Sequence, residues 1–184
     1  MLWNEDIPKL IEKGKDGKVT SINLVAGSFN EKLALPPTPD SWAAAPNNHV
    51  QIWTFEMEAN GEFRIPRITQ DVTRSLYFYE GSSITIAEKE ILKNHLIELN
   101  PAEEVHIING SKKGYFLFLQ GRPINEPSIQ YGPFVANTKE ELQETMQEYQ
   151  RTQFGGWPWA SSDPVHDKFI GRFSKLPNGK EVTK

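Results

Sequence analysis

Hydrophobic and polar residues alternate along much of the chain between residues 19 and 119. The clearest case is the segment from His49 to Glu58, where every second position on one side carries a large apolar residue: Trp53, Phe55 and Met57. Because successive side chains of a strand point to opposite faces, this alternation predicts a half-buried β-strand. A continuous apolar run from Tyr115 to Leu119 instead predicts a strand buried on both faces.

Six further segments show strand-like patterning, and turn residues such as Asn60-Gly61 and Asn109-Gly110 separate them. The predicted strands are Val19–Val25, His49–Glu58, Phe63–Ile65, Ser75–Tyr79, Ile84–Ile86, Ile91–Glu98, Val105–Ile108 and Tyr115–Leu119. Short strands at this spacing favour a closed or nearly closed antiparallel barrel, so we expect an all-β fold.

One helix is expected after the strands. Thr138 and Glu141 have the spacing of a capping box, in which each side chain satisfies a backbone N–H group at the start of a helix. Leu142, Met146 and Tyr149 then fall on one helical face. The pattern therefore predicts an amphipathic helix beginning after Thr138.

The segment from Gly121 to Leu142 reads GRPINEPSIQYGPFVANTKEEL. It resembles the C-terminal domain of the pirin family, in which a G-x-P-x-x-E-P arm leads to a GPFV-x-NT turn and a helix. Pirins resemble two cupin barrels in tandem, so the resemblance implies a single cupin barrel, a double-stranded β-helix or jelly roll. Residues 1–18 are then expected to be an N-terminal arm left from the connection between barrels, 19–137 the barrel, and 138–184 a helix and strap-like tail. The chain is expected to hold only the C-terminal half of a pirin.

Cupins that carry out chemistry place two histidines and a glutamate in the pattern G-x5-H-x-H-x(3–4)-E-x6-G. In this chain Gly61 and Gly81 keep the frame, but Arg67, Thr69 and Arg74 occupy the three ligand positions. A guanidinium group is permanently cationic and offers no lone pair to a metal ion. The sequence therefore predicts a barrel without a metal or another cofactor.

The second cupin motif, P-x-G-x2-H-x3-N, is retained in part. Pro101 and His106 have the expected spacing, but Glu103 replaces the glycine. His106 pointing into the barrel is one interpretation, and a hydrogen-bonded strand histidine is the simpler one. The iron site of the family belongs to the N-terminal barrel, so the resemblance transfers no catalytic residue to this chain.

Arg67 and Arg74 could bind an anion at the barrel mouth, because arginine forms bidentate hydrogen bonds with carboxylates and phosphates. The simpler interpretation pairs them with Glu56, Glu58 or Glu80, or leaves them in water. The ligand-binding candidates are therefore Arg67, Arg74 and His106.

The tail contains two other groupings. Asp163, His166 and Asp167 lie close in sequence, and a capping aspartate beside a surface histidine explains them more simply than a metal site. Phe154, Trp157 and Trp159 form an apolar patch. A monomer rarely exposes a large contiguous apolar surface, so we expect self-association, for example as a homodimer, or pairing with a separate N-terminal cupin half.

Composition restricts the class further. The chain has no cysteine, which excludes disulfides and thiolate chemistry, and no signal-peptide pattern or long apolar segment. We expect a bacterial cytoplasmic protein with no membrane contact. The net charge of −4 and the dispersed tail cations predict no direct contact with nucleic acid.

Three hypotheses for function follow. The leading one is a pirin-like structural and interaction module that is not catalytic by itself. The second is one part of a pirin-type, metal-dependent oxygenase of the quercetinase kind, with the metal in a partner or missing N-terminal barrel. The third is a small-anion-binding cupin that uses Arg67 and Arg74.

Overall fold

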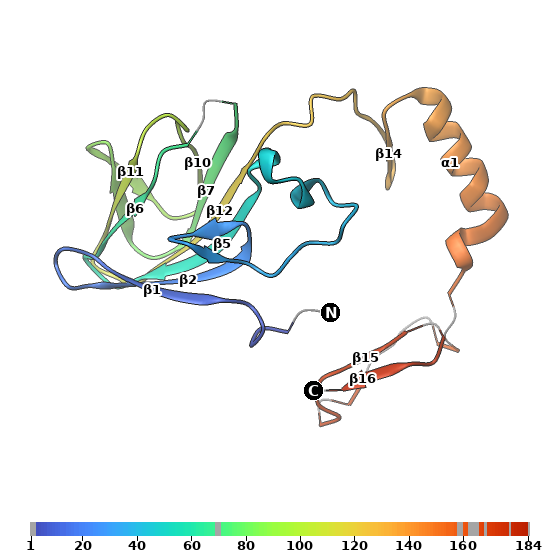
Figure 1. Cartoon of the computed structure of the whole chain (residues 1–184), viewed down its shortest axis with the longest axis horizontal. Coiled ribbons are helices and arrows are strands. Elements are labelled where there is room, and N and C mark those ends of the chain that lie inside the picture. Colours follow the sequence, from blue (N-terminus) through green and yellow to red (C-terminus); the bar gives the residue numbers. More distant parts are fainter. Residues whose placement is uncertain are drawn as a thin grey trace. The chain divides into compact units, whose positions relative to one another are not determined.

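The computed structural model describes residues 3–68, 71–157, 160–161, 166–167, 169–176 and 178–183. The chain forms two compact units, one ending at Pro123 and the other starting at Ile124 (Figure 1). No helix among the described residues is both long and apolar enough to cross a lipid bilayer.

Two antiparallel sheets make up the first unit. The six-stranded sheet has the order β1-β2-β5-β12-β7-β10 and the four-stranded sheet the order β6-β11-β8-β9. The strands of the first sheet, in chain order, are β1 (Lys9–Lys13), β2 (Val19–Ala26), β5 (Gln51–Met57), β7 (Thr73–Glu80), β10 (His95–Glu98) and β12 (Gly114–Gly121). Those of the second are β6 (Glu62–Ile65), β8 (Ser83–Ile86), β9 (Lys89–Leu92) and β11 (Val105–Asn109).

A short hairpin and two 3-10 turns complete this unit. The hairpin consists of β3 (Ser28–Phe29) and β4 (Lys32–Leu33). The turns η1 (Trp42–Ala44) and η2 (Pro46–Asn48) lie between β4 and β5. The predicted all-β architecture is confirmed.

Aromatic side chains from both sheets fill the core. On β12, Phe116 stacks on Phe55 of β5 at 4.7 Å between ring centroids and on Phe78 of β7 at 5.1 Å. Phe55 also lies 5.1 Å from Phe63, which belongs to the other sheet. The buried positions of each strand are therefore the inward half of its alternating pattern, and they join the two sheets into one core.

Three details differ from the expectations drawn from the sequence. β12 is buried on one face only, because its alternate residues, Tyr115 and Leu117 among them, are half-buried. The predicted strand Ile91–Glu98 is two strands, since Asn94 adopts a left-handed conformation (φ 66°) that turns the chain between β9 and β10. The expected N-terminal arm includes β1, which pairs with β2 along its whole length.

The second unit contains the helix and two hairpins. Its elements are β13 (Ile129–Tyr131), β14 (Phe134–Ala136), α1 (Lys139–Thr152), η3 (Gln153–Gly155), β15 (Phe173–Lys175) and β16 (Glu181–Thr183). The predicted capping box at Thr138 and Glu141 is present, with both reciprocal hydrogen bonds. Residues 124–137, which we assigned to the barrel, belong to this unit, while the functional boundaries of the domains stay a prediction.

Candidate functional site

Arg74 lies on the inward face of β7 and is only 4% exposed. Its Nε donates a hydrogen bond to Oε1 of Gln120 at 2.7 Å, and its Nη2 donates to the carbonyl oxygen of Pro66 at 2.6 Å. The guanidinium carbon also lies 5.6 Å from the centre of the Phe118 ring. The partners shown are thus two neutral oxygens and an aromatic face.

The expected pairing of Arg74 with Glu56, Glu58 or Glu80 is wrong. Glu56 forms an ion pair with Lys113, and Glu58 accepts a hydrogen bond from the backbone N–H of Val19. Glu80 is exposed near the far end of β7. Strand geometry explains the error: alternation directs Arg74 into the interior, and Glu80, on the same strand, lies six residues away at its end.

The burial of Arg74 has an electrostatic cost. Burial lowers the pKa of the guanidinium, although the ordinary pKa of arginine is so high that the group stays protonated. Its Nη1 is buried and has no hydrogen-bond partner among the described residues. A buried donor left unpaired is unfavourable by about 1–3 kcal/mol, and more when it is charged.

A cavity of about 200 Å³ is lined by Arg74, Arg67 and Gln120, together with residues of β3 and β5. Arg67 is exposed, whereas Arg74 and Gln120 are buried. Gln120 is held in place by a 3.0 Å hydrogen bond from its Nε2 to the carbonyl oxygen of His49. The structure therefore brings the two predicted arginines to one cavity, one at the surface and one in the interior.

Gln51 borders the same cavity and is fixed by two donors. Its Oε1 accepts hydrogen bonds from the backbone N–H of Ser28 at 2.7 Å and from Nε1 of Trp53 at 3.1 Å. The sequence interpretation missed both Gln51 and Gln120. A signal was available for Gln120, because it is a polar residue that continues the apolar run of β12 onto the buried face.

The donor set does not fit the metal centre of a catalytic cupin. Of the three ligand positions in the sequence frame, Arg67 and Arg74 are cationic and Thr69 lies outside the described residues. A divalent cation beside a buried guanidinium would meet uncompensated repulsion. The described residues also contain no group of three or more His, Cys, Asp or Glu side chains placed to hold a metal ion.

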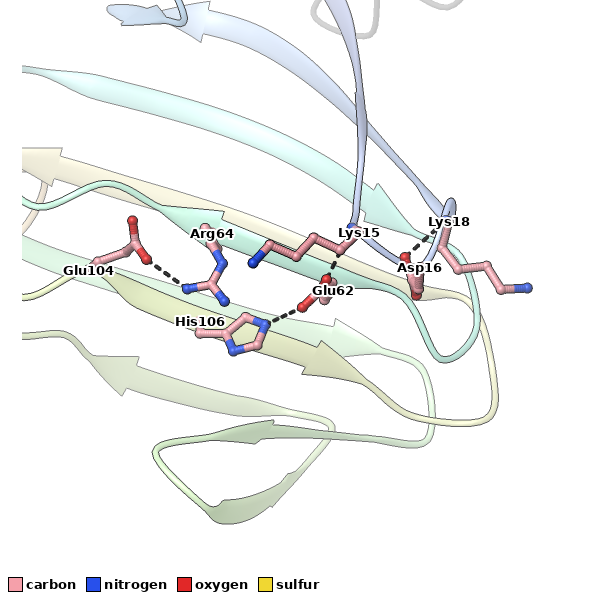
Figure 2. Close-up of polar contacts among 7 residues, drawn as sticks. All are labelled: Lys15, Asp16, Lys18, Glu62, Arg64, Glu104 and His106. Atoms are coloured by element: carbon pink, nitrogen blue, oxygen red, sulfur yellow. Dashed lines mark hydrogen bonds and ion pairs between the residues drawn. The ribbon is translucent and has the colours of Figure 1, made fainter.

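His106 does not point into the barrel. It lies on β11 between the buried residues Val105 and Ile107 and therefore faces outward. Its Nε2 is 2.7 Å from Oε2 of Glu62, and Oε1 of Glu62 accepts a hydrogen bond from the backbone N–H of Lys15 (Figure 2). These contacts connect β6 and β11 to the turn between β1 and β2.

Arg64 and Glu104 form a second ion pair beside these contacts, at 2.7 Å (Figure 2). A cleft of about 320 Å³ adjoins both pairs, and its lining contains cations and carboxylates in equal number: Lys13, Lys15, Arg64, Glu12, Glu62 and Glu104. The charges of this cleft are therefore balanced within the chain. Their role is structural, because the contacts of Glu62 hold the β1–β2 turn against β6.

The Glu62–His106 contact makes stability depend on pH. The hydrogen bond from His106 and, to a smaller extent, that from the Lys15 backbone hold the pKa of Glu62 below its ordinary value, against the opposing effect of burial. Because the pKa of Glu62 is lower in the folded state, its carboxylate stabilises the fold at pH values above the unfolded-state pKa of about 4.5. This stabilisation is lost as the pH falls through the folded-state pKa.

We therefore expect Glu62→Gln to lower the urea midpoint relative to wild type above pH 4.5, and the difference to shrink as the pH falls below this value. Unfolding curves collected between pH 2.5 and 7, in steps of about half a unit, would check this. The control is Glu90→Gln on β9, an exposed position. A difference between Glu62→Gln and wild type that grows toward low pH would contradict the prediction.

The structure describes only some of the tail residues that the sequence analysis singled out. The ring of His166 lies 4.7 Å from that of Phe173, and Oδ1 of Asp167 accepts a hydrogen bond from the backbone N–H of Phe169. Asp163 and Trp159 lie outside the described residues. Asp167 thus has the turn-capping role that the simpler interpretation gave it.

Comparison with known proteins agrees with this architecture. The family model of the Pirin C-terminal cupin domain matches residues 52–155. A putative quercetin 2,3-dioxygenase of Pseudomonas aeruginosa is 29% identical over 147 residues, covering 79% of this chain and 48% of that protein. A pirin-like protein of Solanum lycopersicum is 32% identical over 152 residues, covering 81% of this chain and 47% of that protein.

A solved structure shares the fold. The crystal structure of a quercetin 2,3-dioxygenase from Acinetobacter baumannii has a TM-score of 0.68 at 22% identity, covering 84% of this chain and 50% of that one. The chain thus spans about half the length of the curated relatives just named. With the family model matching more than half of its residues, the chain belongs to the pirin family and carries the pirin C-terminal cupin domain.

Proposed function

We propose that this chain is a non-catalytic cupin half of pirin type that acts as a structural and interaction module. One observation carries the proposal: Arg74, at a ligand position of the cupin frame, is a buried guanidinium bonded to Gln120 and Pro66. A permanently charged group that is fixed in the interior opposes a metal ion. The barrel then acts as a rigid scaffold with a surface for contact with a partner, and it has no reaction centre of its own.

The second unit supports the interaction part of the proposal. Leu142 is the one buried hydrophobic residue among those described from 124 onward. Phe134, Tyr149 and Phe154 contact one another at ring distances of 5.2–6.2 Å, but Tyr149 and Phe154 stay 39% and 59% exposed. A segment with so small a core gains stability by burying apolar area against another surface.

We propose that a cupin half provides that surface, either a second copy of this chain or a separate N-terminal half. The relatives named above are about twice as long as the matched region, which supports a partner barrel as the natural neighbour. The exposed residues available for this contact include Tyr131 and Val135 on the β13–β14 hairpin, which are 64% and 61% exposed.

Metal analysis tests the non-catalytic part. The purified chain, incubated with iron, manganese, nickel or copper and then dialysed, is expected to retain far less than one metal ion per chain. Quercetin should not be consumed by the chain alone. Stoichiometric metal that survives dialysis would overturn the proposal, because the arginines would then not prevent binding.

Light scattering at rising protein concentration tests the interaction part. We expect a mass above that of the monomer, and Tyr131→Ser combined with Val135→Ser should reduce it because both exposed side chains are apolar. The control is Ile11→Ser on β1, which is similarly exposed. A monomer that also fails to bind a pirin N-terminal barrel at high concentration would contradict this part.

A second candidate is favoured by the similarity to quercetin 2,3-dioxygenases. As part of a quercetinase-like oxygenase, the chain would support a metal-bearing barrel outside the matched region. This requires that the chain raise the stability or the turnover of that barrel when the two are mixed. No change in either quantity, with a complex formed, would leave the structural module as the function.

A further inference from the structure

The cavity at Arg74 differs from the neighbouring cleft in its charge. The described residues of its lining include two cations, Arg67 and Arg74, and no aspartate or glutamate, whereas carboxylates balance the cations of the cleft beside Glu62. Low-dielectric walls concentrate the field of such charges inside a cavity. The site is therefore electrostatically incomplete without a negative charge.

The guanidinium group of Arg74 is also fixed in position by hydrogen bonds to neutral groups. Gln120 is oriented by His49, and the carbonyl of Pro66 fixes the other side of the guanidinium, so the group keeps its position without a counter-ion. Buried arginines are normally paired with an acidic group. Here the described residues supply none, and Nη1 has no hydrogen-bond partner among them.

We propose that this cavity binds a small organic carboxylate, whose charged end lies against Arg74 and Arg67. The volume of about 200 Å³ is below the roughly 300 Å³ at which pockets begin to accept drug-sized molecules. Phe29, Trp53 and Ile68 form an apolar part of the lining that suits the body of such a ligand, and Ser28, Asn30 and Gln51 form a polar part. This is a binding activity beyond the structural role proposed above.

The apolar walls favour a carboxylate over inorganic phosphate. Phosphate presents charge and acceptor oxygens in every direction, and those turned toward Phe29 and Trp53 would lose hydration without gaining a donor. An aromatic or short aliphatic carboxylate has its charge at one end only. The two arginines can then bind this end by charge-assisted hydrogen bonds while the rest of the ligand contacts the apolar wall.

The test is a titration of the isotopically labelled full chain with benzoate, followed through the NMR signals of the Arg74 Nε–H and Trp53 Nε1–H groups. Both residues line the cavity, and their N–H groups are bonded to Gln120 and Gln51, which line it as well. We expect saturable shifts of both signals with a Kd of about 1 mM or tighter. Benzamide, a neutral molecule of the same shape, and inorganic phosphate at equal ionic strength should bind at least about tenfold more weakly.

Three variants locate the site. Arg74→Lys keeps the charge but loses the planar fork, and should weaken benzoate binding at least about tenfold. Arg67→Ala, at an exposed position where folding is not at risk, should weaken it about threefold or more. Arg64→Ala is the matched control, because its exposed ion pair with Glu104 lies outside this cavity, and it should leave binding unchanged.

The proposal remains testable even if one of the variants fails to fold. If Arg74→Lys does not fold, the comparison between Arg67→Ala and Arg64→Ala still decides the question. Equal weakening in those two variants would overturn the proposal, since it would reveal general attraction to surface charge. Absence of saturation in the wild type, or equal or tighter binding of benzamide or phosphate, would overturn it as well.

Discussion

Replacement of Phe116 by alanine is expected to lower the free energy of unfolding by about 3–5 kcal/mol. Phe116 is fully buried at the middle of the six-stranded sheet, and its ring stacks on those of Phe55 and Phe78 at interplanar angles of 11° and 18°. Removing the ring loses its transfer free energy and leaves a cavity between two strands that are fixed by their pairing with β12. Urea unfolding at neutral pH would measure the loss.

The matched control is Leu96→Ala on β10, a residue of the same sheet that is 51% exposed. Its expected cost is within about 0.5–1 kcal/mol, as for substitutions outside the core. A similar cost for both variants would contradict a core organised around Phe116. Since domains are typically stable by about 5–15 kcal/mol, Phe116→Ala is expected to leave only a small reserve.

Asn109→Asp should have the second large effect, about 3 kcal/mol or more at neutral pH. The buried side chain of Asn109 donates through Nδ2 to the carbonyl oxygens of Met57 (3.2 Å), Glu58 (2.8 Å) and Lys112 (2.9 Å). These bonds join the end of β5 to the turn between β11 and β12. A carboxylate has no hydrogen to donate and would place negative charge against three carbonyl oxygens.

The pH dependence gives the diagnostic result. The carboxyl group introduced at position 109 is buried, so its folded-state pKa is raised above the unfolded value of about 3.9. Stability is therefore retained best below about pH 4 and is lost as pH rises through the folded-state pKa, up to about pH 7. Asn109→Ala removes the same bonds without a charge, and its cost should be nearly constant over this range.

Thermal unfolding of both variants between pH 4 and 8 would check this difference. If Asn109→Asp and Asn109→Ala were equally stable at every pH, water would reach the site and the side chain would not be the buried link that its contacts indicate. Asn109 and Arg74 are both buried polar residues of this barrel, but they differ in their partners. The three acceptors of Asn109 are supplied by the chain itself, whereas no described acidic group balances Arg74.

The sequence by itself determined the inward faces of the alternating strands, the helix start and the family resemblance. The alternation around Trp53 and Phe55 predicted the inward face of β5, and the spacing of Thr138 and Glu141 predicted the capping box at α1. These predictions succeeded because they depend on neighbours two to four residues apart, and the backbone geometry fixes those relations locally.

The tertiary structure alone decided what surrounds Arg74. Its partners Pro66 and Gln120 lie 8 and 46 positions away, and Gln120 in turn is bonded to His49, 71 positions away. These contacts result from the order β5-β12-β7 in one sheet. No local pattern specifies strand order, so the same arginine could be assigned from the sequence to a surface ion pair or to the interior, and only the packing of the sheets places it inside.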